Sequence, residues 1–506
     1  MTDAIKIIEN GYVFTGDARR RAGRLALLIR NDRITEIGPR GDTFRSLYPG
    51  AEIVNAAGRI VLPGFVDAHL HGESVVLSAV TDGKLLTRWE RDAEIRRATE
   101  YLTKAGADDL RIVYETAYYA AVKSGVTTVA ESGRSEPEHA AAAIVDAARR
   151  AEIRALIALH TGDQAELAEK AKHPSLRFAV PMPDEESLTT YNLQTTVRTA
   201  RDRQWSVMVA HAETRRSHEI LKKNFRRSLM RLLEDYGIFE VPLQLSHLAY
   251  FDDGELDLLA RAGTPIIMSP RAVLRKGTDM PPVAEFLRRK IPVALATDWG
   301  VPDPLAEVRA FAEVVSLIGL SVPRGDDLLA MITSIPARAL GMQQEIGSLE
   351  PGKKADITFL KADDLRFAAS APWDHPSAVL GLVTGGSAGT RVSDVMINGE
   401  FLVREGNILT YAEEDLIRQG QALRLRMHGE RTDEAESMRA ERPAPSVLPA
   451  VRSDESEQPF EEGFRIVRRE DVSDAGLGTV LPLKPAESMK SDLPRNVRKV
   501  FGDDEV

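Results

Sequence analysis

Histidine residues near the start of this sequence have the type and spacing of metal ligands. His69 and His71 end the apolar run Pro63 to His71 and are separated by one residue. Because side chains alternate along a strand, both imidazoles would point to the same side and could bind one divalent cation. The alternative is that they are polar residues packing at the end of a strand.

Three further candidate residues stand at the ends of later apolar runs, namely His211, His247 and Asp298. Each alone could be a core histidine or a capping aspartate. Four strand ends that all carry metal-binding residue types favour a shared site, because the strand ends of a barrel meet at one rim. The chain has no cysteine, so disulfides, thiolate ligands and a cysteine nucleophile are excluded.

The elements that must position these residues are eight apolar runs alternating with helix-like stretches. This alternation predicts an α/β protein with a (β/α)8 TIM barrel. The eight runs cover residues 60–71, 126–131, 153–160, 177–182, 206–213, 242–247, 265–269 and 292–298. Residues 72–125, which contain the amphipathic run Asp109 to Lys123, form an insertion after the first run and are expected to act as a lid.

Short strand patterns with tight turns occur on both sides of the predicted barrel. We expect residues 1–60 and 345–415, the latter with an Asn398-Gly399 turn, to form one small composite β-sandwich. The barrel then covers residues 61–344. Residues 416–506 are expected to contain a C-terminal helix followed by a disordered tail, because the tail is polar and lacks apolar periodicity.

Composition narrows the class of protein. The formal net charge of -10 argues against general nucleic-acid binding. No stretch reaches the roughly 18 apolar residues of a membrane-spanning helix. No secretory signal is visible at the amino terminus, so we expect a cytoplasmic location.

The sequence resembles the metal-dependent amidohydrolases over most of residues 5–415. It is most similar to the branch that contains adenosylhomocysteine and methylthioadenosine deaminases, guanine and cytosine deaminases, and triazine chlorohydrolases. The segments that carry the resemblance are Leu62 to His71, Leu85 to Trp89, Ser124 to Val129, His211 to Thr214, Ser246-His247, Leu295 to Asp298, and Val395 to Val403.

This resemblance implies a metal held by His69, His71, His211 and Asp298. Binuclear members add a carboxylated lysine on the fourth strand, but residues 175–182 contain no lysine, so the resemblance implies one divalent metal per chain. Imidazole and carboxylate ligands suit zinc and ferrous iron alike, and we expect zinc, with iron as the alternative.

The resemblance also implies catalytic roles. Asp298 would take a proton from the attacking water, Glu213 would protonate a ring nitrogen of the substrate, and His247 would hydrogen-bond the attacking oxygen. In this branch the glutamate follows the strand-five histidine by three residues, whereas Glu213 follows His211 by two. Both side chains share one side only if the strand continues through Glu213.

Trp89, His160 and Ser269 stand where the family contacts its substrates. Trp89 could stack on a heterocycle or pack into the core as a lid residue. Glu73 and Arg134 are further candidates at the rim.

The expected reaction is hydrolytic deamination of an amino-substituted nitrogen heterocycle of purine, pyrimidine, pterin or triazine type. The substrates are thus a small molecule and water. Hydrolysis of a cyclic amide or a carbon–halogen bond is the alternative reaction. A catalytically silent scaffold is a third reading, which the retention of all four expected ligands disfavours. We expect a homo-oligomer, a dimer or higher.

Overall fold

The computed structural model describes residues 3–133, 137, 139–160, 167–168, 171–362 and 392–428. The chain divides into two units, residues 1–442 and 443–506. The second unit lies wholly outside the described residues, as does the tail predicted from about residue 430. Among the described residues, no helix is long and apolar enough to cross a membrane.

Eight parallel strands form the central sheet, in the order β15-β14-β13-β12-β11-β10-β9-β8. A bridge between Leu70 and Asp298 links its two edges, which confirms the predicted TIM barrel. The strands are β8 (Phe65–Leu70), β9 (Val126–Glu131), β10 (Arg154–Ala158), β11 (Leu176–Pro181), β12 (Ser206–Ala210), β13 (Leu243–Ser246), β14 (Ile266–Met268) and β15 (Val293–Leu295).

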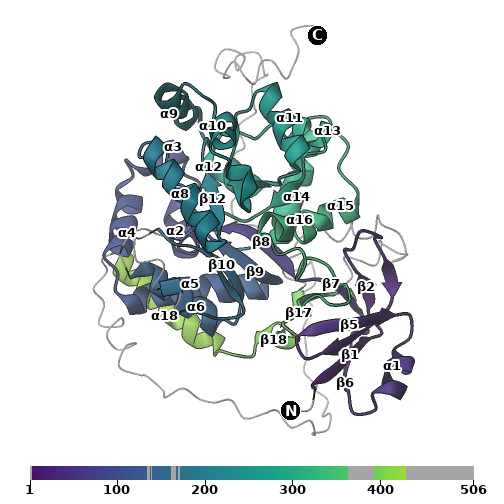
Figure 1. The fold of residues 1–506 in the computed structure, drawn as a ribbon. Coiled ribbons are helices and arrows are strands. Elements are labelled where there is room, and N and C mark those ends of the chain that lie inside the picture. Colours follow the sequence, from purple (N-terminus) through teal and green to yellow (C-terminus); the bar gives the residue numbers. More distant parts are fainter. Residues whose placement is uncertain are drawn as a thin grey trace, which may run out of the picture. The chain divides into compact units, whose positions relative to one another are not determined.

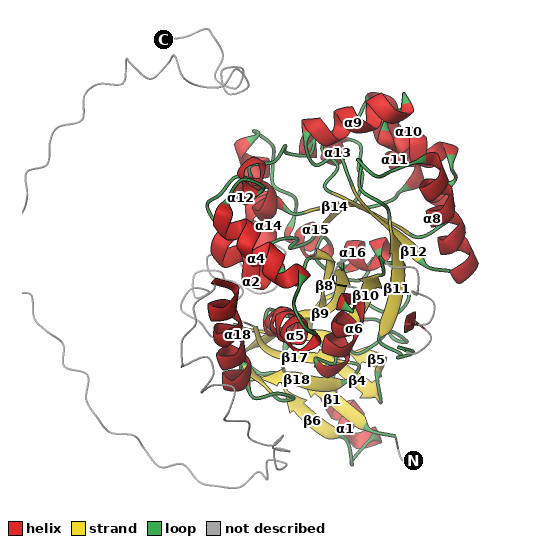
Figure 2. Ribbon diagram, turned by 90° about the vertical axis from the view of Figure 1, so that its left-hand side faces the viewer, coloured by secondary structure: helices red, strands yellow, loops and turns green. Residues whose placement is uncertain are grey.

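Two layers of apolar side chains hold the barrel together. Small residues such as Ala68, Ala130 and Ala179 face inward in one cluster, while larger ones such as Val207 and Val209 face the surrounding helices. Figure 2 shows several of these helices around the strands. Those between and after the strands are α6 (Ala140–Arg150), α8 (Thr190–Arg203), α9 (Arg215–Phe225), α10 (Leu229–Asp235), α11 (Asp253–Ala262), α12 (Pro270–Lys276), α13 (Val283–Arg288), α14 (Pro304–Leu317), α15 (Gly325–Ala330) and α16 (Ser334–Ala339), with a 3-10 turn at Ile238–Glu240.

Strands from both parts of the chain build the smaller domain, as expected. One sheet has the order β5-β4-β1-β6, and the other, β19-β18-β17-β16-β7-β2-β3, joins amino-terminal and carboxyl-terminal strands. Ile8 and Leu27 of the first sheet share a buried cluster with Ile357 and Phe359 of the second. The elements are β1 (Ile5–Glu9), β2 (Tyr12–Phe14), β3 (Ala22–Arg24), β4 (Ala26–Arg30), β5 (Arg33–Gly38), α1 (Gly41–Leu47), β6 (Glu52–Asn55), β7 (Arg59–Pro63), β16 (Ile357–Lys361), β17 (Val392–Ile397), β18 (Glu400–Arg404) and β19 (Asn407–Ile408).

The run predicted as one strand over residues 60–71 is divided at Gly64. Strand β7 before it pairs in the seven-stranded sheet, and β8 after it starts the barrel. A Cβ atom at Gly64 would collide with the Thr127 side chain, so only glycine permits this close approach of the backbone. Both strands are buried, so the apolar run continues through Gly64 and the sequence alone does not show where one strand ends and the next begins.

The insertion after β8 contains α2 (Ser74–Thr81), α3 (Leu86–Trp89), α4 (Ala93–Thr103) and α5 (Ala107–Lys123). The run expected within a lid instead forms α5, which packs against β9 and α6 as a helix of the barrel. The C-terminal helix, α18 (Glu413–His428), begins slightly earlier than expected. It packs against α4 and α5 (Figure 1), where Arg426 pairs with Asp109 at 2.6 Å.

Candidate active site

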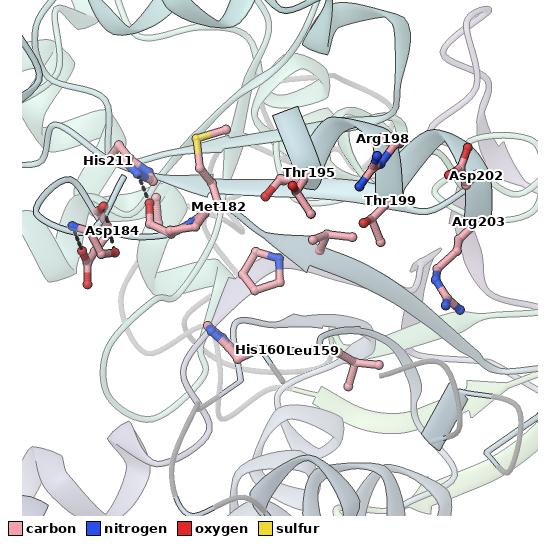
Figure 3. Close-up of a pocket in the computed structure, with 16 residues that line it drawn as sticks. Leu159, His160, Met182, Asp184, Thr195, Arg198, Thr199, Asp202, Arg203 and His211 are labelled. Carbon is pink, nitrogen blue, oxygen red and sulfur yellow. Dashed lines mark hydrogen bonds between the residues drawn. The ribbon is translucent and has the colours of Figure 1, made fainter. Parts of the chain in front are cut away.

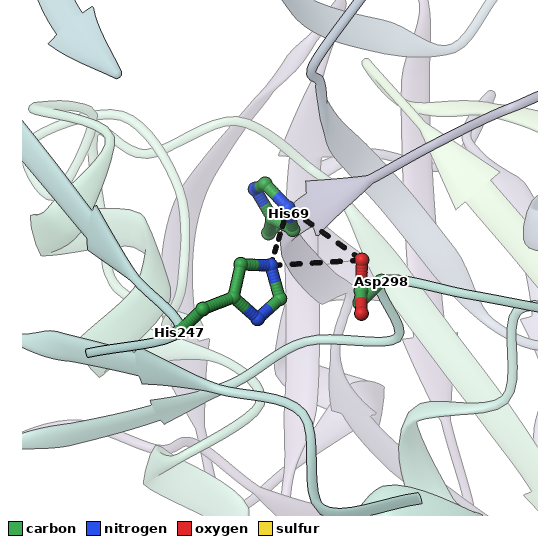
Figure 4. A group of neighbouring side chains, drawn as sticks. All are labelled: His69, His247 and Asp298. Carbon is green, nitrogen blue, oxygen red and sulfur yellow. Dashed lines mark hydrogen bonds and ion pairs between the residues drawn. The ribbon is translucent and has the colours of Figure 1, made fainter. Parts of the chain in front are cut away.

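Two imidazoles and one carboxylate meet at the carboxyl ends of the barrel strands. Ligand atoms of His69, His247 and Asp298 all lie within 4.8 Å of one another (Figure 4). His69 belongs to β8, His247 follows β13 and Asp298 follows β15. The Nε2 atoms of His69 and His247 are 2.9 Å apart.

The Oδ1 atom of Asp298 is the point on which the imidazoles converge. Nε2 of His69 and of His71 each lie 3.7 Å from this oxygen, and Nε2 of His247 lies 3.6 Å away. Asp298 is fully buried, and its Oδ1 has no hydrogen-bond partner. Three imidazole nitrogens around one orphaned carboxylate oxygen are a donor set that suits a divalent metal ion.

The backbone fixes this arrangement. The amide of Asp298 donates to the carbonyl of His69 at 2.9 Å, and the amide of His71 donates to the carbonyl of Asp298 at 3.1 Å. His247 and Asp298 adopt positive φ angles of 67° and 52°, which are uncommon for residues other than glycine. Such strained backbone is typical of functional sites.

Burial keeps the imidazoles in the form that binds metals. It lowers the pKa of His69 well below the usual value and also lowers the pKa of His71. Both rings are therefore neutral at pH 7, as ligation requires. The hydroxyl of Ser132 lies 3.2 Å from Nδ1 of His69 and helps to orient that ring.

Strand β12 ends earlier than predicted, and this separates His211 from Glu213. The strand stops at Ala210, and Ala212 adopts a positive φ of 56°. His211 is 1% exposed, and its Nε2 lies 2.7 Å from the carbonyl oxygen of Pro183, outside the group formed by His69, His247 and Asp298. The expectation of a strand that continues through Glu213 is therefore wrong, because the backbone turns at position 212.

Lys276, which the sequence analysis missed, reaches the site from the end of α12. Its Nζ lies 2.6 Å from Oδ2 of Asp298 and 3.3 Å from Oε1 of Glu213. Burial alone would raise the pKa of Asp298, but the Lys276 ammonium holds it below the usual range. In the sequence, Lys276 resembles an ordinary basic residue in the last turn of a helix, so no pattern distinguished it.

An aromatic pair extends from the site to the insertion. The rings of His71 and Trp299 have centroids 5.9 Å apart, and those of Trp299 and Trp89 are 4.9 Å apart. Nε1 of Trp89 donates to the carbonyl of Lys84 at 3.0 Å. Trp89 thus borders the site through Trp299, whose role the sequence analysis did not predict.

The other predicted substrate contacts occupy different surroundings. His160 is exposed, and its Nε2 lies 2.8 Å from the carbonyl oxygen of Ser132. Ser269 is buried beside the start of α12, and its hydroxyl has no hydrogen-bond partner. Glu73 lies 4.0 Å from His71, whereas Arg134 lies outside the described residues.

A cavity of about 1390 Å³ lies beside the ends of β10, β11 and β12 (Figure 3). His160, Met182, Ala210 and His211 line it near the strands, and side chains of α8 such as Arg198 line it farther away. His160 and His211 therefore share this cavity rather than the Asp298 cluster.

Two buried carboxyl groups, also missed from the sequence, accept hydrogen bonds from backbone amides next to the candidate metal ligands. Asp67 accepts a hydrogen bond from the amide of Thr297 at 3.0 Å, which fixes the residue before Asp298 to β8. Burial raises the pKa of Asp67 to about 6. Glu131 accepts from the amides of Gly72 and Gly133 at 3.2 Å and so holds the turn after His71.

Known proteins resemble this chain over most of its length. The relatives include 5-methylthioadenosine/S-adenosylhomocysteine deaminases from Moorella thermoacetica (26% identical, 80% of this chain and 95% of the relative) and Pelotomaculum thermopropionicum (27%, 81% and 95%). Similar solved structures include a zinc-bound adenosine deaminase from Xanthomonas campestris (TM-score 0.75, 20% identity, 84% of this chain and 99% of that chain). A variant of atrazine chlorohydrolase from Arthrobacter aurescens, complexed with zinc and atraton, has a TM-score of 0.72 at 20% identity and covers 83% of this chain and 100% of its own.

The structural likeness shows the fold, and the sequence model of the Amidohydrolase family matches residues 60–402. The matched segment includes the barrel and most of the carboxyl-terminal strands of the sandwich. The chain therefore belongs to the amidohydrolase family and is a hydrolase.

Proposed function

We propose that this chain is a metal-dependent deaminase that removes an exocyclic amino group from a nitrogen heterocycle by hydrolysis. The observation that carries the proposal is the convergence of His69, His71 and His247 on Oδ1 of Asp298 at the barrel rim. The deaminase names of the relatives support the same reaction type.

We assign the metal to His69, His71, His247 and Asp298, with one ion per chain, and we expect zinc. When bound, the ion supplies the Lewis acidity that makes water nucleophilic at neutral pH. The assignment replaces His211 with His247 as the third imidazole, because His211 faces Pro183 instead of Asp298.

Glu213 is the carboxylate best suited to move protons. Asp298 is a weak base because its pKa lies below the usual range. Glu213 is partly exposed, with 24% of its side chain accessible, and it lies beside the same Lys276 ammonium. It can therefore exchange protons with a bound substrate, as general acid–base catalysis requires.

The aromatic side chains beside His71 suit a flat substrate. Trp299 and Trp89 are partly buried, and the Trp299 ring lies next to His71. A heterocycle would gain from stacking on an indole in this position. The polar group that recognises its nitrogen atoms would then be the Glu213 carboxylate.

Release of ammonia from a panel of purines, pyrimidines, pterins and triazines tests the proposal. Zinc-loaded protein is expected to deaminate at least one class. Glu213→Gln should retain metal and lose about 10²- to 10⁴-fold in turnover, the usual contribution of an acid–base group. Glu219→Gln, an exposed change on α9, is the matched control and should leave turnover unchanged.

Two results would count against the proposal. Ammonia release from no heterocycle by zinc-loaded protein, with chloride release or ring opening observed instead, would favour the dehalogenase or cyclic amidase reaction. Unchanged turnover in metal-loaded Glu213→Gln would remove the proton-transfer role from this residue while leaving the reaction type intact.

A further inference from the structure

Strand β12 contributes no imidazole to the Asp298 cluster. Met208 belongs to the inward-facing cluster of the barrel, and side chains alternate along a strand, so Ala210 is the last residue of β12 that faces inward. His211 follows the strand, and its Nε2 lies 2.7 Å from the carbonyl oxygen of Pro183. Among the described residues, the group of His69, His247 and Asp298 therefore receives no imidazole from the end of β12.

Lys276 supplies a positive charge to the same group of side chains. Its ammonium contacts Asp298 and Glu213 together, and only 6% of the residue is exposed. The Trp299 ring lies on another side, 5.6 Å from Nζ. A lysine this deeply buried requires anionic partners, and these two carboxylates provide them.

The helix that carries Lys276 is fixed at both ends. At its start, the amide of Arg271 donates to the buried Glu307 carboxylate at 3.0 Å. At its end, Gly277 has a φ of 65°, and its amide donates to the carbonyl of Val273 at 2.9 Å. This is a left-handed C-cap of the kind that glycine favours. The ammonium is therefore held at Asp298 by a capped helix.

We propose that Lys276 is a built-in cation of this site that competes with a divalent metal for Asp298. The two carboxylate oxygens are divided, with Oδ1 toward the imidazoles and Oδ2 toward the ammonium. A fixed positive charge beside the ligand carboxylate repels a second cation and offsets part of its negative charge. The chain consequently holds zinc more weakly than the same ligands would without the lysine.

This inference rests on the proposed metal site but not on the proposed deaminase reaction. The test accordingly measures zinc binding to the full-length, metal-stripped protein in the absence of substrate, by competition with a chromophoric chelator. Lys276→Gln removes the charge and keeps a hydrogen-bond donor. It should bind zinc at least tenfold more tightly than the wild type.

Two controls separate the charge from its position. Lys276→Arg keeps the charge and should not tighten zinc binding. Lys290 is exposed and precedes β15, whereas Asp298 follows that strand. Lys290→Gln therefore removes a charge at the far end of β15 and should bind zinc as tightly as the wild type. Lys276→Met provides the same test if the glutamine variant fails to fold, as judged by circular dichroism and thermal unfolding.

The outcomes distinguish the two proposals. Equal or weaker zinc binding by a folded, uncharged Lys276 variant, with the wild type still binding one zinc ion, overturns the role of Lys276 and leaves the proposed function standing. Absence of zinc binding in every variant overturns both. Tighter binding without ammonia release from any heterocycle supports the competition and refutes the deaminase proposal.

Discussion

Glu131 is buried at the end of β9, and its titration should make the protein less stable as the pH rises. Burial, with a further contribution from Glu73, raises the pKa of Glu131 from 4.5 to about 8. The folded state therefore retains a proton that the unfolded chain releases between those pH values. The stability that the protonated Glu131 contributes is fully present below pH 4.5. It decreases as the pH rises from there to about 8. We predict that Glu131→Gln, which cannot ionise, removes this dependence.

The size of the effect follows from the shift. Each pH unit between the two pKa values costs about 1.4 kcal/mol of unfolding free energy. Integrated over the titration, Glu131 should destabilise the wild type by about 3 to 4 kcal/mol between pH 5 and pH 8. At pH 5 the neutral amide and the protonated acid are near-isosteric, so the two proteins should be similarly stable. At pH 8 the variant should be the more stable protein.

Urea unfolding of both proteins at pH 5, 6, 7 and 8 measures the difference. Glu219→Gln, an exposed change on α9, controls for the loss of one carboxylate and should follow the wild type. A free-energy difference between Glu131→Gln and wild type that stays constant across these pH values would refute the assignment of a protonated Glu131.

Three other changes test how the parts of the chain depend on one another. Arg154→Met leaves the buried Asp356 carboxylate without its guanidinium partner and should cost about 3 to 5 kcal/mol in urea unfolding, whereas a loss below 1 kcal/mol would show that the pair is solvated. Leu423→Ala opens a cavity between α18 and the insertion helices and should lower the unfolding free energy by about 2 to 5 kcal/mol, unless α18 unfolds separately. Removal of residues 429–506, which lack apolar periodicity, should leave the thermal midpoint unchanged, and a clear decrease would assign them a structural role.

The sequence by itself determined the order of the barrel strands and the composite origin of the sandwich. Buried parallel strands leave continuous apolar runs, and the alternation with helical stretches allows few other topologies. The same logic placed His69, His247 and Asp298 at one rim, because a residue at the end of a barrel strand must lie there. The resemblance carried by these segments also identified the family that the match over residues 60–402 establishes.

Only the tertiary structure decided what happens just beyond the strand ends. Position 211 follows an apolar run, but a single left-handed residue at Ala212 turns its neighbours in different directions, and alternation no longer applies once the strand has ended. The ion-pair partner of Asp298, Lys276, could not be predicted from the sequence either. Lys276 lies 22 residues away along the chain. A long flexible side chain at the end of a helix has the same sequence signature whether it faces solvent or enters a buried site, because its direction is set by the packing of that helix.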